Sequence, residues 1–539
     1  MQYLPILHSH FYSARFAVLL ACTFLLPSSL IHAQFATIQN DRFWYTNDGK
    51  PINSQGGGIF RFANATGEEK YYWYGVHYAE ADSFRNNPTN TFNQCTFEAV
   101  TCYSSTDLVH WNFEANVLSK SEVLKDGRNT WVGRLGVAYL PETQQYAMLV
   151  QHGSEVLIAV SKQPTGPFTW HRKINMQSMI GTSNTGDQTV FTDENTGKSF
   201  LVYSYGKGRN KIYVSEIGVV NGQVGLLDCT KVFEGESREG NCMFQYNGRY
   251  YMAASNIYGW DASYAYYLMA NDIRGPYTPV NNMQVMKGCE FDYAHVSQTG
   301  FFVSIHGSKQ TSILYCGDRW ANFAGNGLGY NQWVPLSFED SVPIFHSLHA
   351  WDLNASTGVW KVNPLNNYAL NPSFEADRKA IPSLVKPVQQ QLTGWHSEVL
   401  QGNNISLDTS ISPILNHANT TAERHMVTGE RSLSMSDKTA FERKVYQTIS
   451  STYHVPLPNG RYTFSAMAKY SAGIEKLELF ATSNQQTYRL PLHSHTETWH
   501  RVTLNNVLVK NGQADIGFYI KANALAYCHI DDVAFVQEK

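Results

Sequence analysis

One acidic residue near the middle of the chain has the sequence context that a proton donor for sugar hydrolysis needs. Glu239 lies in Glu236-Ser237-Arg238-Glu239-Gly240, at the start of a strand-like run. Such a donor must keep its proton near neutral pH, so its carboxyl should be desolvated or close to another acid. Gly240 would let a ligand approach the backbone closely. Because most Glu residues are solvated surface groups, the segment alone makes Glu239 only a candidate general acid.

The elements that must position this residue form a repeat. Between residues 54 and 338 a unit of roughly 40–50 residues returns five times, with short runs dense in Tyr, Phe and Val. The first strands of the five units are predicted at 58–62, 135–140, 188–192, 243–246 and 300–306. Units of about four strands are typical of propeller blades, which predicts an all-β chain with a five-bladed β-propeller over 34–362. Polar strand ends could converge in its central funnel.

A second β-rich region follows a change in character after Trp360. Strands are predicted at 444–449, 460–469, 476–482, 499–504, 514–520 and 530–535. Short strands at this regular spacing are typical of a β-sandwich. Residues 363–539 are therefore predicted to form a second domain, a jelly-roll sandwich.

The composition excludes some classes of function. The 539 residues are 13% aromatic and 16% charged, with a net charge of −3. This balance fits many short strands, and it provides no basic surface for nucleic acid, so we exclude nucleic acid as a partner. The aromatic surplus suits a sugar-binding protein, because ring faces pack on sugar rings. An ordinary β-core accounts for it equally well.

The N-terminus has the pattern of a secretory signal peptide over 1–33. His8, His10 and Arg15 precede a largely apolar run at 16–26, and Ile31-His32-Ala33 offers a cleavage site before Gln34. The run is short for a membrane span, although an uncleaved anchor is an alternative. We expect a secreted, extracellular or periplasmic monomer with no membrane span in the mature chain. Export permits disulfides, and Cys95–Cys102 is a candidate bridge.

Motifs spread over 48–337 carry a family resemblance. They include Asp48-Gly49-Lys50-Pro51-Ile52, Tyr71-Tyr72-Trp73-Tyr74-Gly75, Gly133-Arg134-Leu135-Gly136-Val137, Gly186-Asp187-Gln188-Thr189, Arg238-Glu239-Gly240, Gly259-Trp260, Ser297-Gln298-Thr299 and Gly317-Asp318-Arg319-Trp320. In this order they resemble glycoside hydrolase family 43, most closely its exo-β-1,3-galactanase branch. The resemblance implies an inverting, exo-acting enzyme on a polysaccharide, expected to be β-1,3-galactan. It implies no cofactor for the chemistry.

The resemblance also implies site residues. Glu239 matches the general acid, and Asp187 matches the carboxylate that orients the acid and raises its pKa. Gln298 matches a glutamine proposed in this branch as an imidic-acid base; the alternative is that it only orients water or sugar. An inverting enzyme keeps acid and base roughly 6.5–9.5 Å apart. The candidate substrate-binding residues are Gln55, Tyr74, Arg134, Trp260 and Trp320, with the two tryptophans as a sugar platform.

Two departures from the family pattern leave rival functions open. The segment Asn53-Ser54-Gln55-Gly56-Gly57-Gly58 lacks the Asp that most of the family carries early in blade one, and Gly133 stands where fungal members of the branch have Glu. Asp318 and Arg319 are expected to form a structural ion pair. The rivals are an α-L-arabinofuranosidase or β-xylosidase, a catalytically silent glycan-binding propeller, and an adhesion protein whose sandwich is the working part.

The second region resembles jelly-roll carbohydrate-binding modules. Asn371-Pro372-Ser373-Phe374-Glu375, Pro458-Asn459-Gly460-Arg461-Tyr462 and Ile530-Asp531-Asp532-Val533 carry this resemblance. It implies a structural Ca²⁺ held by Glu375 and Asp532, whose hard oxygen ligands suit the ion. The alternative is a sandwich with neither metal nor sugar affinity.

Overall fold

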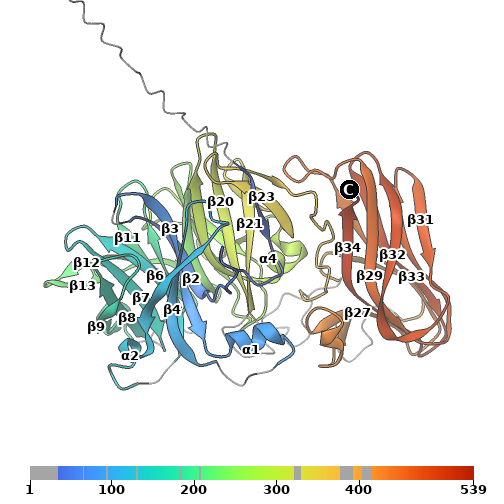
Figure 1. Cartoon of the computed structure of the whole chain (residues 1–539), viewed down its shortest axis with the longest axis horizontal. Coiled ribbons are helices and arrows are strands. Elements are labelled where there is room, and N and C mark those ends of the chain that lie inside the picture. The colour runs from blue at the N-terminus through green and yellow to red at the C-terminus, as the bar shows by residue number, and fades with distance from the viewer. Residues whose placement is uncertain are drawn as a thin grey trace, which may run out of the picture.

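The computed structural model describes residues 34–539 except 65, 91, 93–94, 129–130, 154, 183–184, 206–207, 321–328, 377–391 and 404–414. The predicted signal segment therefore lies outside the described residues. The described chain consists mainly of β-strands, arranged in two bodies that lie side by side (Figure 1). The predicted all-β fold class is confirmed.

Five antiparallel sheets form the first body. The strands of each sheet follow the order of the chain, except that the fifth strand of blade three pairs with the third. Blades one and two contain β2 (Gln55–Ala63), β3 (Glu69–Tyr78), β4 (Phe97–Ser105) and β5 (Asn112–Ser119), then β6 (Val132–Leu140), β7 (Gln145–His152), β8 (Glu155–Ser161) and β9 (Thr169–Ile174). Blade three contains β10 (Gln188–Thr192), β11 (Ser199–Tyr205), β12 (Lys211–Val220), β13 (Gln223–Leu226) and β14 (Thr230–Glu234). Blades four and five contain β15 (Glu239–Tyr246), β16 (Arg249–Ser255), β17 (Tyr266–Ala270) and β18 (Gln284–Val285), then β19 (Gln298–His306), β20 (Thr311–Trp320), β21 (Gly329–Glu339) and β22 (Val342–Phe345).

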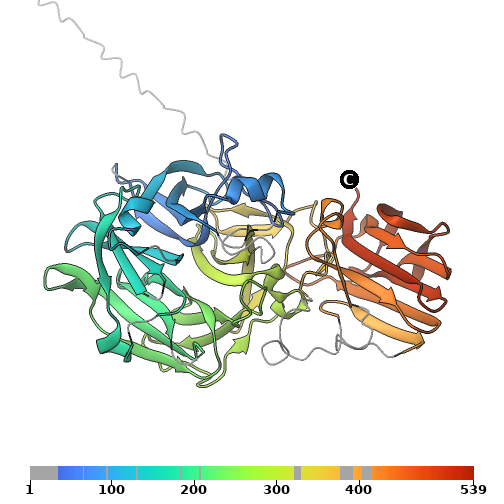
Figure 2. The same ribbon diagram turned by 90° about the horizontal axis from the view of Figure 1, so that it is seen from below.

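The first strand of each blade lies at the centre. β2 contacts β6, β6 contacts β10, β10 contacts β15, β15 contacts β19, and β19 contacts β2, which closes a ring. The blades follow one another around this axis (Figure 2). Buried side chains fill the space between neighbouring blades; for example, the rings of Trp73 and Trp333 lie 4.7 Å apart. The ring makes the N-terminal ends of all five central strands neighbours.

A small sheet joins the two ends of the propeller. β1 (Ala36–Gln39) pairs with β23 (Ala350–Asn354), which pairs with β24 (Val359–Val362). The short helices are α1 (Ala81–Asn86), α2 (Lys120–Val123) and α3 (Gln177–Ile180). The segment labelled α4 (Tyr293–Val296) has φ between +50° and +56°, so it is a left-handed turn. This turn comes directly before β19. None of the described helices is long and apolar enough to cross a membrane.

Two five-stranded sheets form the second body. One has the order β25 (His396–Gln401), β28 (Phe441–Ser450), β33 (Gln513–Ala522), β30 (Ile474–Ser483), β31 (Gln486–Pro491). The other has the order β26 (Leu415–Ala418), β27 (Arg431–Ser436), β34 (Tyr527–Gln537), β29 (Gly460–Tyr470), β32 (Thr496–Val509). Alternate residues of both sheets point into one apolar core, where Phe464 and Phe518 are 5.6 Å apart. A sandwich was predicted for this region.

The cysteines are not paired. All seven from Cys95 to Cys528 are free thiols in this structure, so no bridge joins Cys95 and Cys102. Cys102 is fully buried in the core between blades one and two, where it packs as a small apolar side chain.

Candidate active site

The central strands bring the predicted catalytic residues to one end of the propeller. Glu239 is the first residue of β15, Gln298 is the first residue of β19, and Asp187 directly precedes β10. Gln55 begins β2, and Arg134 is the third residue of β6. The side chains of all five line one cavity of about 330 Å³. A set of residues spread over 244 positions in sequence therefore meets because each lies at the same end of its blade's inner strand.

A glycine shapes the start of β15. The pairing of β15 with β16 shifts register between Glu239 and Cys242, and Gly240 has φ +63°. A Cβ at Gly240 would lie 2.5 Å from the carbonyl oxygen of Thr299 on the neighbouring blade. The glycine is thus needed for packing against blade five, a role that the sequence analysis did not assign to it. This packing places Glu239 beside β19.

Glu239 has the environment of an acid that keeps its proton. Its side chain is 7% exposed, and its Oε1 accepts a hydrogen bond from Gln298 Nε2 at 2.7 Å. Arg209 donates to its Oε2. Burial, followed by the negative charge of Asp187, raises the pKa of Glu239 to about 8, against the opposing charges of Arg209 and Arg134. The carboxyl is therefore mainly protonated at neutral pH, as a general acid requires.

Asp187 is the ionised partner of this acid. Burial works against its ionisation, but the charges of Arg209 and Arg134 outweigh that and lower its pKa. Its Oδ2 accepts hydrogen bonds from Gly240 N at 3.0 Å and Arg134 Nε at 3.2 Å. The two carboxyls thus have pKa values pushed in opposite directions, which is the pattern of an assigned acid and a charged neighbour.

Arg134 connects three blades beneath the cavity. Its Nε donates to Asp187, its Nη1 donates to Asp318 Oδ2 at 2.9 Å, and its Nη2 donates to Gln298 Oε1 at 2.8 Å. Its side chain is buried, and these carboxylates raise its pKa although burial opposes this. Arg134, predicted as a substrate-binding residue, does line the cavity. Its donors are directed mainly at protein groups, so its main role is to fix Asp187 and Gln298.

The hydrogen bonds of Gln298 define which way its amide points. Its Oε1 accepts from Arg134 Nη2 and from Trp320 Nε1 at 2.9 Å, and its Nε2 donates to Glu239. Arg and Trp side chains only donate, so the reverse orientation would set donor against donor. An imidic-acid tautomer would need a hydroxyl hydrogen on this oxygen, where two donors already point. The observed contacts therefore favour the ordinary amide.

The geometry also differs from the predicted acid–base separation. The Gln298 amide is within hydrogen-bond distance of Glu239, whereas an inverting pair keeps its groups about 6.5–9.5 Å apart. In this arrangement no water can lie between the two groups. Gln298 is positioned to hold the acid, and its second Nε2 hydrogen is available for water or sugar.

Two polar atoms in the cavity are buried without a hydrogen-bond partner among the described residues. They are Gln55 Oε1 and Trp131 Nε1, an acceptor and a donor. Leaving such groups unpaired costs about 1–3 kcal/mol each. A ligand rich in hydroxyl groups could satisfy both, which supports a sugar ligand for this cavity. Trp260 and Trp320 form its rim, with ring centroids 5.2 Å apart in an edge-to-face pair.

Comparison with known proteins shows the family of the chain. The model of the glycosyl hydrolases family 43 matches residues 44–318. The chain belongs to glycosyl hydrolase family 43. The solved exo-β-1,3-galactanase of Clostridium thermocellum is 25% identical over 61% of this chain and 68% of its own, with a TM-score of 0.51. The exo-β-1,3-galactanase of Phanerochaete chrysosporium in its galactose complex is 18% identical over 92% of this chain and 100% of its own, with a TM-score of 0.51.

One curated protein also matches, over a short stretch. A 1,6-α-glucosyltransferase from Sporosarcina globispora is 28% identical over 102 residues. The match covers 18% of this chain and 8% of that protein, so the chain spans a small part of that relative's length. The family predicted from the motifs is confirmed by the family model and by these galactanase structures. Family 43 chemistry needs no cofactor.

Tyr74 does not belong to this family 43 site, contrary to the prediction. Its ring is fully buried between blades one and two, and its hydroxyl donates to Pro164 O at 2.6 Å. Side chains alternate along β3, and β3 is the second strand of its blade, away from the axis. Burial raises the pKa of Tyr74 well above its ordinary value. The residue stabilises the contact between two blades.

Asp318 and Arg319 do not pair with each other, so that prediction was also wrong. Consecutive residues of a strand point to opposite faces. Asp318 binds Arg134, whereas Arg319 Nη1 donates to Asp41 Oδ1 at 3.1 Å. Asp41 Oδ2 lies 3.0 Å from His295 Nε2 and 2.5 Å from His349 Nδ1. Asp41 is thus the centre of a polar network with Arg319, His295 and His349. This network fixes the N-terminal segment to blade five.

The position of the missing carboxylate in blade two is filled by an aromatic ring. A Cβ at Gly133 would lie 2.2 Å from the ring of Trp131. Gly133 and Trp131 both line the cavity. The indole of Trp131 therefore occupies the space that a side chain at position 133 would need.

Sequence reasoning missed three residues of the site: Tyr78, Trp131 and Arg209. Arg209 contacts both carboxyls, with Nη1 3.4 Å from Asp187 Oδ1. It lies in the loop before β12, where no repeated motif marks it. Trp131 could have been predicted from the sequence. A tryptophan two residues before a glycine can fill the space that the glycine leaves empty, as the Trp131 ring does beside Gly133.

The predicted calcium ligands, Glu375 and Asp532, lie in the sandwich next to a third acidic residue, Asp531. Burial, then the charges of Asp532 and Glu375, raises the pKa of Asp531 well above its ordinary value. The pKa of Asp532 is also raised, with burial as the first cause. Two buried carboxyls that repel each other are a donor set that fits a hard divalent cation.

Proposed function

We propose that the protein is an exo-acting β-1,3-galactanase that is exported as a monomer and hydrolyses galactan with inversion. The observation that carries the proposal is the buried, protonated Glu239 next to the ionised Asp187 in a cavity of about 330 Å³. The Clostridium thermocellum galactanase, at 25% identity, supports the choice of substrate. Export rests on the sequence of residues 1–33.

In the proposed reaction Glu239 protonates the glycosidic oxygen of the leaving chain. Before the proton is transferred, the charge of Asp187 helps to keep the pKa of Glu239 raised. Gln298 Nε2 donates a hydrogen bond to Glu239 Oε1 and so orients the carboxyl. Water attacks the anomeric carbon from the opposite face in a single displacement as the glycosidic C–O bond breaks. The water releases one proton to solvent, and Glu239, left ionised, takes a proton from solvent before the next turnover. The second Nε2 hydrogen of Gln298 helps to position sugar or water. Gln298 is a positioning residue in this scheme, because its amide is a very weak base.

The size of the cavity supports exo action. A volume of about 330 Å³ lies at the lower end of small-ligand pockets, which span about 300–1,000 Å³. One terminal sugar fits such a space with its hydroxyls near Gln55 Oε1 and Trp131 Nε1. The enzyme would then release one monosaccharide at each turnover.

A substrate panel tests this function. The protein is incubated with β-1,3-galactan, arabinan, xylan and nitrophenyl glycosides, and the released sugars are identified. Galactose from β-1,3-galactan is the expected result. Arabinose or xylose would instead support the related α-L-arabinofuranosidase or β-xylosidase activities. Glycan binding without release would support a silent propeller.

Trp131 is expected to bind the terminal sugar in place of the missing carboxylate. Trp131→Ala should lower kcat/KM on galactan roughly tenfold or more, because a buried aromatic contact and a hydroxyl partner are both lost. Trp170→Ala, in the same blade but outside the cavity, is the matched control and should leave kcat/KM unchanged. Equal losses in both variants would contradict the assignment.

Gly133→Glu tests whether the Trp131 indole fills the space beside position 133. The new side chain collides with the Trp131 ring, and such overpacking costs about 1–3 kcal/mol, so the melting temperature should fall. In a Trp131→Ala background the glutamate has room, and the loss should disappear. A double variant no more stable than Gly133→Glu would show that the indole does not occupy this space.

We further propose a structural Ca²⁺ held by Glu375 and Asp532, with Asp531 next to Asp532 in the chain. Calcium should raise the melting temperature. At a free Ca²⁺ concentration one hundred times Kd, it should add about 2.7 kcal/mol to the free energy of unfolding. Asp532→Asn should lose this calcium response, because it removes one of the two carboxylate ligands. Asp515→Asn, on β33, is the control that should keep the response, and a response retained in Asp532→Asn would contradict the site.

A further inference from the structure

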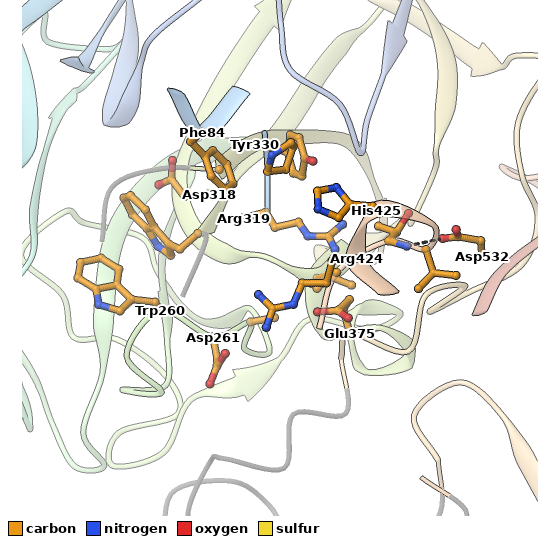
Figure 3. Close-up of a pocket in the computed structure, with 18 of the residues that line it drawn as sticks. Phe84, Trp260, Asp261, Asp318, Arg319, Tyr330, Glu375, Arg424, His425 and Asp532 are labelled. Carbon is orange, nitrogen blue, oxygen red and sulfur yellow. Dashed lines mark hydrogen bonds between the residues drawn. The ribbon is translucent and has the colours of Figure 1, made fainter. Parts of the chain in front are cut away.

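A second cavity lies between the two bodies and adjoins the catalytic cavity. Its volume is about 320 Å³. The propeller lines it with Trp260, Trp320 and Tyr330, among others, and the sandwich lines it with residues 424–429, Glu375 and Asp532 (Figure 3). It is therefore a site that neither domain forms alone.

The two cavities share a wall. Trp260 and Trp320 line both of them. The ring of Trp320 is held in place by its Nε1 hydrogen bond to Gln298 and by the Arg134 guanidinium, 5.6 Å from the ring centroid. A chain whose terminal sugar occupies the catalytic cavity can thus continue across this pair of rings into the second cavity. Aromatic rings are well suited to packing against sugar rings along such a path.

The charges around the second cavity favour a neutral ligand. Arg319 and Arg424 lie near its centre in Figure 3, with Asp261, Glu375 and Asp532 around them. The cavity thus offers charged groups of both signs and no uniform charge, so a polyionic chain of either sign would meet groups of like charge. A polyhydroxyl chain can use donors and acceptors together, as the neutral galactan of the proposed function would.

The sandwich side of the cavity is held in place. Thr428 N donates to Asp532 Oδ1 at 3.3 Å, and His425 Nε2 is 3.4 Å from Thr89 Oγ1 of the propeller. Ala376, at the start of the sandwich region, packs against Tyr258 and Tyr293 of the propeller. These contacts fix residues 424–429 opposite the tryptophan pair, so the wall is preformed.

We propose that this cavity binds the leaving-group side of the galactan chain and that the sandwich is a working part of the active site. This inference rests on the proposed function, because it names where the rest of that substrate lies. His425 and Met426 are among the exposed sandwich residues of the wall. They should contribute to the hydrolysis of long chains and not to the chemical step, which takes place beyond Trp260 and Trp320.

The test compares substrates of increasing length. His425→Ala and Met426→Ala should lower kcat/KM on long β-1,3-galacto-oligosaccharides roughly three- to tenfold, the loss expected from one lost contact. Turnover of nitrophenyl β-galactoside should stay unchanged, because it does not reach the second cavity. Leu525→Ala, on an exposed turn at the other end of β27, is the control and should leave both unchanged.

Each outcome supports or overturns the inference. Losses confined to long chains, with unchanged melting temperatures, would support it. Unchanged kcat/KM at every chain length, or equal losses on nitrophenyl galactoside and long chains, would overturn it and leave the proposed function intact. If the unmodified protein releases no galactose from any substrate, the proposed function fails and the inference fails with it.

Discussion

Glu239→Gln is expected to reduce galactose release from β-1,3-galactan by about 10²–10⁴-fold, the usual contribution of a general acid. The amide keeps the size of the carboxyl but has no acidic proton to transfer to the leaving oxygen. Binding of galacto-oligosaccharides should remain, because the cavity walls are unchanged. Initial rates and calorimetric binding measured on the same preparation check both halves of this prediction.

A nearby glutamate provides the control. Glu236 is three residues earlier and largely exposed, and its carboxylate pairs with Arg238 at 2.7 Å. Glu236→Gln should leave the rate within a factor of about two, as is usual for exposed positions. Comparable activity of Glu239→Gln and the wild type would remove Glu239 from the reaction and favour a silent or differently arranged site.

Asp187→Asn should move the alkaline limb of the pH profile to lower pH. In the wild type the acid has a pKa of about 8, so kcat/KM should fall above this pH as Glu239 ionises. The substitution removes the negative charge that raises this pKa, whereas Arg134 and Arg209, which lower it, remain. At pH 8 a fall of one pKa unit would lower the protonated fraction of Glu239 from about one half to about one eleventh, a loss of roughly fivefold in kcat/KM.

A pH–rate profile distinguishes this role from a merely structural one. Measured between about pH 5 and 9, kcat/KM of Asp187→Asn should recover relative to the wild type towards acid pH, where Glu239 is protonated in both. Asp228→Asn, in the same blade but paired with Arg274, should keep the wild-type profile. A uniform loss at every pH in Asp187→Asn would mean that Asp187 only supports the fold.

The repeat in the sequence was sufficient to predict the propeller. Aromatic and β-branched runs at regular spacing indicate burial on both faces of each blade. The predicted first strands fall within β2, β6, β10, β15 and β19, although four of these strands begin two to four residues earlier than predicted. Once the blades are assigned, Glu239, Asp187 and Gln298 must lie at one end of the ring. The position of a side chain at the start of an inner strand was therefore predictable.

The orientation of single side chains was harder to predict. Tyr74 shares a motif with its neighbours, but strand alternation turns its ring into the core between blades. Arg319 follows Asp318 in sequence yet faces Asp41, for the same reason. Arg209 reaches Glu239 from a loop of blade three, and such a contact between distant segments leaves no local pattern. The Gln298–Glu239 hydrogen bond likewise depends on how blades four and five pack.

The most direct test of the account is proton NMR of β-1,3-galactan during the first minutes of hydrolysis. It identifies both the sugar that is released and the anomer that forms first. A single displacement at a β-linked terminal galactose predicts α-galactose at the start, followed by slow conversion to the equilibrium mixture. Initial β-galactose would contradict the inverting mechanism, and the absence of free galactose would contradict the proposed activity itself.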